Sequence, residues 1–390
     1  MSTPSQRVCR LKRCQIMLLL AVALLICAPL PVLAKAGSSE LWQTLAEAGI
    51  AARQEARYED AERLFLLAGR ETEQFEPEDP RVAATLNQLG LVYHAQGQYA
   101  RAKPCYEQAL ARWERALGSE HADVSSALNN LAEIYLEEGE LAQAESYYLR
   151  SLAIGERVLG AGHHELAVGY NNLAGLYRKQ GRLPQAEAKF RLALALLDGA
   201  DPSASIDPAP ILNNLAALYK EQGFYVYAEP LYRQALSLRR ARFGDRHPAV
   251  AICLNNLANL YHAQGLSEYA DRFYREALAV SEAAAGPEAA LTGTILGNWA
   301  WLVHERGLAD EATLLYQRAL VIQQQTLGRD HPMVAMILDR YAGLLSDLGR
   351  SLEANRFALR AAAIRAQHSA PSRSSTRSQP NVTSQEVQIP

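Results

Sequence analysis

Apolar and polar residues follow a frame along this chain that returns every 42 residues. In the segment LNNLAEIYLEEG at 128–139, Leu128, Leu131 and Tyr135 are spaced i, i+3 and i+7, which places them on one face of a helix. Six more copies keep this spacing: LNQLGLVYHAQG at 86–97, YNNLAGLYRKQG at 170–181, LNNLAALYKEQG at 212–223, LNNLANLYHAQG at 254–265, LGNWAWLVHERG at 296–307 and LDRYAGLLSDLG at 338–349. Seven copies that start 42 residues apart, with no insertion or deletion between them, predict an array of stacked repeats.

Each unit predicts two helices joined at a glycine. Gly139 ends the first helix, because glycine adopts the left-handed cap conformation at little cost. The second helix carries a large ring between two small residues, as at Ala144, Tyr148 and Ser151. A ring with small neighbours can fill a gap on an adjacent helix, so we expect this face to pack inside the array.

Prolines and histidines mark the helix boundaries of the frame. Pro184 falls near the first residue of its second helix, and Pro104 and Pro230 share one position about four residues further in. We expect all three in a first turn, where proline is tolerated because those N–H groups lack intrahelical partners. The turns after the second helices carry the histidines His121, His163, His247 and His331. Repeats stacked roughly 10 Å apart would hold them too far from one another to share a metal, so we interpret them as structural.

Two connections depart from the frame. Residues 198–210 read DGADPSASIDPAP, and residues 283–288 read AAAGPE. The period survives at both places but the His-Pro turn is lost. We expect a shorter second helix or a looser loop there.

The chain begins with a segment typical of a secretory leader. Residues 1–34 hold four basic residues and no acidic one, an apolar run covers 16–28, and Val32 and Ala34 precede a cleavage point ahead of Lys35. The apolar run is shorter than the roughly 20 residues of a bilayer span. We expect an exported protein, periplasmic or secreted, with no membrane span after cleavage. The alternative is a retained N-terminal membrane anchor.

Four parts follow from these patterns. Residues 1–34 are the signal peptide, 35–84 a degenerate or capping repeat, 85–366 the seven 42-residue units, and 367–390 a tail. The tail is rich in Ser, Gln and Pro and has no apolar period, which predicts disorder.

Charge, cysteine content and motifs narrow the class of function. Outside the leader the chain carries 35 basic and 42 acidic residues, a charge of −7, which argues against nucleic acid as the main partner. Cys105 and Cys253 lie more than three repeats apart, beyond disulfide reach, and no zinc-finger spacing occurs. P-loop, GxSxG and HExxH motifs are absent from the sequence. We predict a binding protein that is not an enzyme and holds no metal or cofactor.

The unit LNNLAxLYxxQGxYxxAExLYxRAL…LGxxHPxVA resembles the kinesin light chain type of tetratricopeptide repeat over roughly residues 81–366. The resemblance implies an all-α fold, a right-handed superhelical solenoid of seven to eight helix pairs. It also implies a concave groove, lined by the first helices, that binds peptides with first-helix asparagines among the contacts. The chain lacks a preceding heptad coiled coil and carries an export leader, so we expect a bacterial envelope protein and not a motor subunit.

Candidate contact residues lie on the side of the first helices opposite the apolar stripe. Asparagine is a poor interior helix former, so the repeated Asn-Asn pairs need another reason. The second Asn of a pair can fix the stacking of neighbouring repeats, and the first can contact a partner through its amide. Basic residues and an aromatic ring follow on this face. The candidate set is Asn129, Asn171, Asn172, Arg178, Lys179, Asn213, Asn214, Lys220, Asn255, Asn259, His262 and Trp301.

This set predicts a groove that is acidic early, at Glu133 and Glu137, and basic in the middle. Our hypothesis is that repeats 169–265 hold an acidic segment or a C-terminal carboxylate of a protein partner through cations and amides. The alternative is a solvated charged face. Alanine at Arg178, Lys179 and Lys220 together is expected to weaken capture and its salt dependence.

Two further expectations concern aromatic and apolar residues late in the chain. Trp299 takes the place of a core leucine and is expected to pack, whereas Trp301 is a candidate aromatic anchor. The last unit carries Leu344, Leu345 and Phe357 with no clear polar capping helix after it. Terminal repeats normally present a polar outer face. The alternative function is therefore end-to-end self-association, as a self-assembling structural protein of the envelope.

Overall fold

The computed structural model describes residues 37–55, 57–198 and 206–369. The predicted leader and tail lie outside the described residues, apart from the end of the last helix. Within the described ranges the regular structure consists of sixteen helices and no strand. The all-α fold predicted from the sequence is confirmed.

The helices form pairs that follow the 42-residue frame. The first helices are α2 (Ser38–Gln54), α4 (Pro80–Ala95), α6 (Ala122–Glu137), α8 (Leu166–Lys179), α10 (Ala209–Glu221), α12 (Pro248–Ala263), α14 (Ala290–Glu305) and α16 (Pro332–Asp347). The second helices are α3 (Tyr58–Thr72), α5 (Tyr99–Leu117), α7 (Leu141–Leu159), α9 (Leu183–Ala195), α11 (Tyr225–Phe243), α13 (Ser267–Ala285), α15 (Ala309–Thr326) and α17 (Ser351–Ser369). From α5 onward, each second helix begins 42 residues after the one before.

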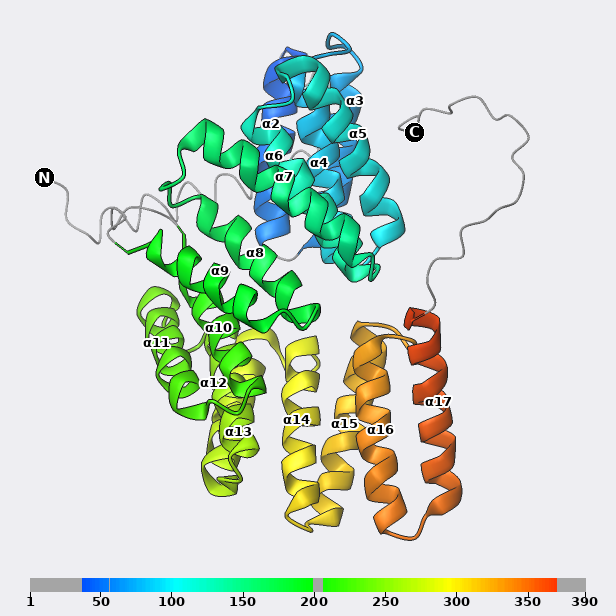
Figure 1. The fold of residues 1–390 in the computed structure, drawn as a ribbon. Coiled ribbons are helices and arrows are strands. Elements are labelled where there is room, and N and C mark those ends of the chain that lie inside the picture. Colours follow the sequence, from blue (N-terminus) through cyan, green and yellow to red (C-terminus); the bar gives the residue numbers. More distant parts are fainter. Residues whose placement is uncertain (1–36, 56, 199–205, 370–390) are drawn as a thin grey trace, which may run out of the picture. The chain divides into compact units, whose positions relative to one another are not determined.

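The described residues belong to two compact units. The first comprises 37–55, 57–137 and 146–158, and the second comprises 138–145, 159–198 and 206–369, so that α7 contributes to both. In the second unit, α12 with α13, α14 with α15 and α16 with α17 lie side by side as hairpins (Figure 1). No helix in the described part of the chain is long and apolar enough to cross a bilayer.

A buried ring on each second helix from α3 to α15 fills the space between neighbouring helices. In α5, Tyr106 is fully buried between Ala102 and Ala109, as the spacing predicts. The same position is buried in later pairs, at Tyr148, Phe190, Tyr232, Tyr274 and Tyr316. Phe65 is the ring of the first pair and lies 41 residues before Tyr106, so the degenerate copy is offset by one residue.

Glycines with positive φ follow the ends of helices, and histidines in the turns bond to the backbone near helix starts. Gly139, between α6 and α7, has φ +80°, and Gly244, after α11, has φ +78°, a backbone conformation that residues with a Cβ rarely adopt. The imidazole Nδ1 of His247 accepts the backbone N–H of Ala249 at 3.2 Å, which caps the start of α12. His121, His163 and His331 accept a backbone N–H two residues onward in the same way, at 3.2, 3.3 and 3.1 Å. His247 and His331 therefore cap α12 and α16, a structural role as predicted, and His121 and His163 accept the same bond in their turns.

The expectation about the position of two prolines needs correction. Pro104 and Pro230 are the sixth residues of α5 and α11, beyond the first turn, so the first-turn prediction was wrong for them. The helices continue because the carbonyls that lose a partner belong to the exposed residues Ala100 and Val226, where water can bond them. Pro184 does lie in the first turn of α9.

The two irregular connections behave differently. α9, which precedes 198–210, has 13 residues where most second helices have 19, as expected. α13 keeps all 19 residues, so no shortening accompanies the sequence AAAGPE. Gly286 follows α13 with φ +99° and ends it as glycines end the regular second helices. The His-Pro turn is therefore not needed to terminate a full-length helix.

Two buried tyrosines provide a test of the hydroxyl's role in these pairs. The Tyr274 hydroxyl donates to Asn259 Oδ1 at 2.6 Å, whereas the buried Tyr316 hydroxyl has no hydrogen-bond partner among the described residues. We expect Tyr274→Phe to lower the free energy of unfolding by about 1 kcal/mol. Tyr316→Phe should leave it unchanged or raise it, because burying an unbonded hydroxyl is costly. Urea titration of both variants checks this, and an equal loss in the two would contradict it.

Candidate functional site

A cavity of about 490 Å³ opens on the first helices of the second unit. Four successive pairs contribute to its wall, through α10, α12, α14 and α16. We call it the first-helix pocket, and its lining residues are Lys220, Asn259, His262, Ala263, Asn298, Trp301, Glu305 and Arg340. Its volume lies in the range of sites that take a small ligand or a few side chains of a peptide.

Two cations line the first-helix pocket without a carboxylate partner. Burial lowers the pKa of Lys220 and also that of Arg340, because removal from water disfavours the charged form. Within the part of the chain that the structure describes, neither side chain forms an ion pair with a carboxylate. Arg340 donates one hydrogen bond, from Nη1 to Asn298 Oδ1 at 3.1 Å, although a guanidinium offers five N–H donors. Glu221 and Glu305 attract Lys220 and Arg340 without forming ion pairs with them, so N–H donors of both cations remain available to an anion.

Trp301 provides an aromatic surface beside these cations. Its side chain is 38% exposed, and the Arg340 guanidinium carbon lies 4.2 Å from the ring centroid. The His262 ring meets Trp301 edge to face with centroids 4.7 Å apart. His262 Nε2 also lies 2.9 Å from the Glu305 carboxylate, which is half exposed at the rim. Stacking on Trp301 and the bond to Asn298 fix the orientation of Arg340.

The amides in the pocket are oriented by their neighbours. Asn259 accepts the hydrogen bond from Tyr274 through its oxygen, which leaves its NH₂ group as a donor. Asn298 Nδ2 donates to Asn255 Oδ1 at 3.2 Å, and its oxygen accepts from Arg340. The pocket thus presents a guanidinium, an ammonium and an amide donor.

Most of the predicted asparagines connect adjacent repeats and do not line the pocket. An Asn at the second position of the Asn-Asn motif donates to an Asn at the first position in the preceding repeat: Asn130 to Asn87 at 2.9 Å, Asn214 to Asn171 at 3.0 Å, and Asn298 to Asn255 at 3.2 Å. Both positions of the motif therefore take part in stacking, including Asn171 and Asn255, for which partner contact was predicted.

The remaining predicted residues lie at other places on the first helices. Asn171 Nδ2 also donates to Asn172 Oδ1, and Asn213 Nδ2 contacts Cys253 Sγ at 3.5 Å. The Arg178 Nε atom lies 3.9 Å from Glu221, so its charge is partly compensated. Asn129 is on α6, and Lys179 is the last residue of α8. Of the candidate set, the pocket gathers Lys220, Asn259, His262 and Trp301.

Three chemically important residues of the pocket are outside the predicted set. Asn298, Glu305 and Arg340 line it but were not among the candidates. The sequence carries a signal for Arg340, which stands 42 residues after Asn298, at the position that Asn occupies in earlier copies. Trp299 is 6% exposed and donates from Nε1 to Asp271 at 2.9 Å, so its predicted packing role is confirmed.

A model of the tetratricopeptide repeat matches residues 81–154, 123–198, 207–283 and 291–367, more than half of the chain. The chain belongs to the tetratricopeptide repeat family. This family match confirms the assignment made from the 42-residue frame. Tetratricopeptide repeats form a helical scaffold for protein interactions, and this repeat protein is such a scaffold. A comparison with curated proteins yields no match.

Several solved structures resemble this repeat protein. BtubC from P. vanneervenii is 26% identical, with 52% of this chain and 81% of that protein covered and a TM-score of 0.45. A Podosopora anserina protein described as a kinesin light chain with nearly identical TPR-like repeats is 22% identical, with 53% and 97% covered and a TM-score of 0.44. A Rap protein complexed with competence and sporulation factor is 13% identical over 85% of this chain and 99% of that protein, with a TM-score of 0.54. This last likeness is one of fold.

Proposed function

We propose that this tetratricopeptide repeat protein captures a carboxylate-bearing segment of a partner protein in the first-helix pocket. The carboxylate is an acidic side chain or the C-terminus of the partner. The observation that carries the proposal is the pair Lys220 and Arg340, two partly buried cations that form no ion pair with a carboxylate among the described residues. A desolvated cation is costly unless it is paired, so an anionic ligand gains from both.

The ligand chemistry follows from the geometry of the pocket. The Arg340 guanidinium is planar and can bond both oxygens of a carboxylate at once, which gives shorter and stronger hydrogen bonds than neutral pairs. Lys220, on α10, adds a second positive charge. Trp301 offers an apolar face to the neighbouring side chain of the same segment. Glu305 at the rim repels a second carboxylate there, so the bound segment should carry its negative charge at one point.

The proposal can be tested without knowing the partner. A random peptide library with free C-termini is selected on the purified chain, and enriched peptides are synthesised with acidic residues intact or changed to amides, and with free or amidated C-termini. We expect one of these carboxylates to be required for binding. Loss on C-terminal amidation identifies a terminal carboxylate, and loss on Asp→Asn or Glu→Gln identifies a side chain. Enriched peptides that bind equally well without any carboxylate would refute the proposal.

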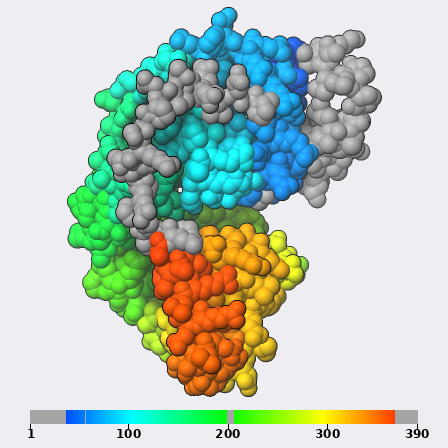
Figure 2. Space-filling model, turned by 90° about the vertical axis from the view of Figure 1, so that its right-hand side faces the viewer, coloured from blue at the N-terminus to red at the C-terminus, as the bar shows by residue number. Residues whose placement is uncertain are grey.

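Self-association is a second candidate function, and the last helix favours it. Leu352 and Leu359 of α17 are 89% and 72% exposed and stand seven residues apart on one face. Figure 2 shows α17, in red-orange, at the viewer's side of its unit with no other helix in front of it. An uncovered apolar face at the end of an array can stack on a second copy. Leu352→Glu with Leu359→Glu should then reduce the mass measured by light scattering at high concentration. A wild-type chain that is monomeric at that high concentration would exclude this role.

Export is a further part of the proposed function. It rests on the leader predicted at 1–34 and places the partner in the periplasm or outside the cell. N-terminal sequencing of the chain from the producing cell should begin near Lys35. A full-length N-terminus on a chain recovered from the cytosol would contradict this.

A further inference from the structure

One turn histidine stands in a cluster that differs from the other turns of the array. In two other turns a proline follows the capping histidine, at Pro248 and Pro332, whereas here the residue after His163 is His164. Glu165 comes next, and α8 begins only at Leu166. The 42-residue frame would start this helix at 164, since α6 starts at 122. The sequence His-His-Glu therefore stands in the connection ahead of the helix.

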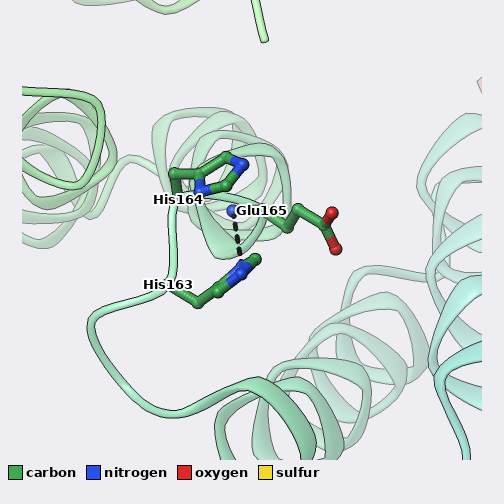
Figure 3. A group of neighbouring side chains, drawn as sticks. All are labelled: His163, His164 and Glu165. Carbon is green, nitrogen blue, oxygen red and sulfur yellow. Dashed lines mark hydrogen bonds between the residues drawn. The ribbon is translucent and has the colours of Figure 1, made fainter. Parts of the chain in front are cut away.

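The three side chains bring metal-ligating atoms close together. A nitrogen of each imidazole and a carboxylate oxygen of Glu165 all lie within 4.8 Å of one another. The two rings stack with centroids 4.5 Å apart and planes 26° apart, and Figure 3 shows His163 and His164 facing each other beside the start of α8. Both histidines are partly exposed and Glu165 is exposed, so an ion can reach the cluster from solvent.

Most ligand atoms of the cluster have no other role. In the described part of the chain, the ring nitrogens of His164 and the carboxylate of Glu165 have no hydrogen bond or ion pair. His163 uses only Nδ1, which accepts the backbone N–H of Glu165 at 3.3 Å (Figure 3). That bond is the longest of the four that the turn histidines accept from a backbone N–H, which range from 3.1 to 3.3 Å. By contrast, the carboxylate that follows His121 lies 3.4 Å from that ring and has no second imidazole beside it.

We propose that His163, His164 and Glu165 bind a divalent zinc ion. Two imidazoles and one carboxylate form a ligand set that zinc accepts, with a water in the fourth position. Tetrahedral zinc would hold its ligand atoms about 3.4 Å apart, closer than the present spread, given Zn–N and Zn–O bonds of about 2.0–2.1 Å. Rotation of the exposed Glu165 side chain and of the two partly exposed rings can close that gap. This site is separate from the first-helix pocket and does not rest on the proposed function.

Zinc binding at this cluster competes with the hydrogen bond that His163 accepts in the turn ahead of α8. His163 accepts a hydrogen bond at Nδ1, so its proton is on Nε2 in the metal-free chain. Zinc at Nδ1 would displace the Glu165 N–H, and zinc at Nε2 would move the proton to Nδ1, where it can no longer accept that bond. In either case the ion replaces the hydrogen bond from the Glu165 N–H to His163, which lies in the turn ahead of α8.

The decisive experiment compares zinc stoichiometry in matched variants of the full chain, measured by competition with a chromophoric chelator. His164→Pro restores the His-Pro pair of the turns at 247 and 331, so it removes a ligand while keeping a turn that the array already uses. His247→Ala is the control, because it removes a capping histidine where no second imidazole stands. We expect the wild type and the His247→Ala variant each to bind one more zinc ion per chain than the His164→Pro variant binds. Equal stoichiometry in all three chains would overturn the proposal.

A second measurement locates the ion and covers the case in which His164→Pro does not fold, as judged by circular dichroism. His164→Ala then takes its place, and hydrogen exchange at the backbone amides of 163–167 is followed with and without zinc. Loss of the hydrogen bond from the Glu165 N–H to His163 predicts that zinc speeds exchange of the Glu165 amide in the wild type and not in His164→Ala. If zinc binds but leaves exchange in this segment unchanged, the ion lies elsewhere and the proposal fails.

Discussion

Replacing Arg340 by alanine is expected to remove most of the affinity of this repeat protein for a carboxylate-bearing peptide. Arg340 supplies the planar donor group of the first-helix pocket and is held against Trp301 and Asn298. Truncating one partner of a buried, hydrogen-bonded charge pair costs about 2–5 kcal/mol, which corresponds to a rise in Kd of roughly 30-fold at the lower end. Calorimetric titration of the selected peptide into wild type and variant measures this directly.

The same substitution should leave the stability of the chain unchanged or improved. Arg340 is desolvated and forms no ion pair within the described residues, so its removal relieves a cost in the free chain. Arg340→Met, which keeps the packing volume of the stem, should show no fall in the midpoint of thermal unfolding. Arg340→Lys keeps the charge but loses the planar fork, so we expect an intermediate affinity. A destabilised Arg340→Met chain would mean that the guanidinium serves the fold.

The variant with alanine at Arg178, Lys179 and Lys220 provides a comparison between the sequence-based hypothesis and the pocket. Of these three residues, only Lys220 lines the pocket, and Arg178 lies near Glu221. The triple variant should therefore lose no more affinity than Lys220→Ala alone. A further loss from Arg178 and Lys179 would extend the binding surface onto α8.

The sequence predicted the pocket only in part, because the 42-residue frame shows which positions share a face but not which side chains reach into the preceding repeat. Lys220 and His262 stand 42 residues apart, and so do Asn259 and Trp301, so the frame alone placed them on one face. Arg340 occupies the position of the second Asn of a pair, which the sequence assigns to stacking as readily as to binding. Its long side chain instead reaches back to Asn298 and Trp301 of the preceding repeat. That reach is a tertiary contact, which a one-dimensional pattern does not contain.

A second large effect is expected from Gly90→Ala on α4. A Cβ at this position would lie 2.5 Å from Cε1 of Tyr106, whose ring is fully buried. Alanine is the residue at the equivalent positions of the later repeats, such as Ala132 and Ala174, so the sequence frame alone would suggest a harmless change. Overpacking a closed core costs about 1–3 kcal/mol, and we expect a loss of stability in this range.

Gly175→Ala is the matched control for this prediction. Gly175 lies inside α8, and no atom of a neighbouring residue lies within 4 Å of the place that a methyl group would take. Alanine there should therefore raise the free energy of unfolding by roughly 0.5–1 kcal/mol.

Adding Tyr106→Leu to Gly90→Ala should recover part of the loss of stability, because the smaller side chain makes room for the new methyl group. Chemical denaturation of the single and double variants tests this coupling. Strictly additive losses in the double variant would show that the Tyr106 ring is not the cause.

The fold was more predictable than the site because the frame encodes it many times. Glycine between the helices recurs at one register, and Gly139 is one of seven such positions with positive φ. Each copy confirms the others, so single deviations such as the sixth-residue prolines in α5 and α11 do not change the assignment. A binding site depends instead on the few positions that depart from the repeat, here Trp301 and Arg340, for which no second copy exists to check the interpretation.

The most direct test of the central claim is a structure of this chain with a selected peptide bound. We expect a carboxylate of the peptide to lie within hydrogen-bond distance of the Arg340 guanidinium, with Lys220 nearby and a side chain of the peptide against Trp301. A peptide seated elsewhere on the chain, or one whose carboxylates all point to solvent while Arg340 keeps only its bond to Asn298, would contradict it.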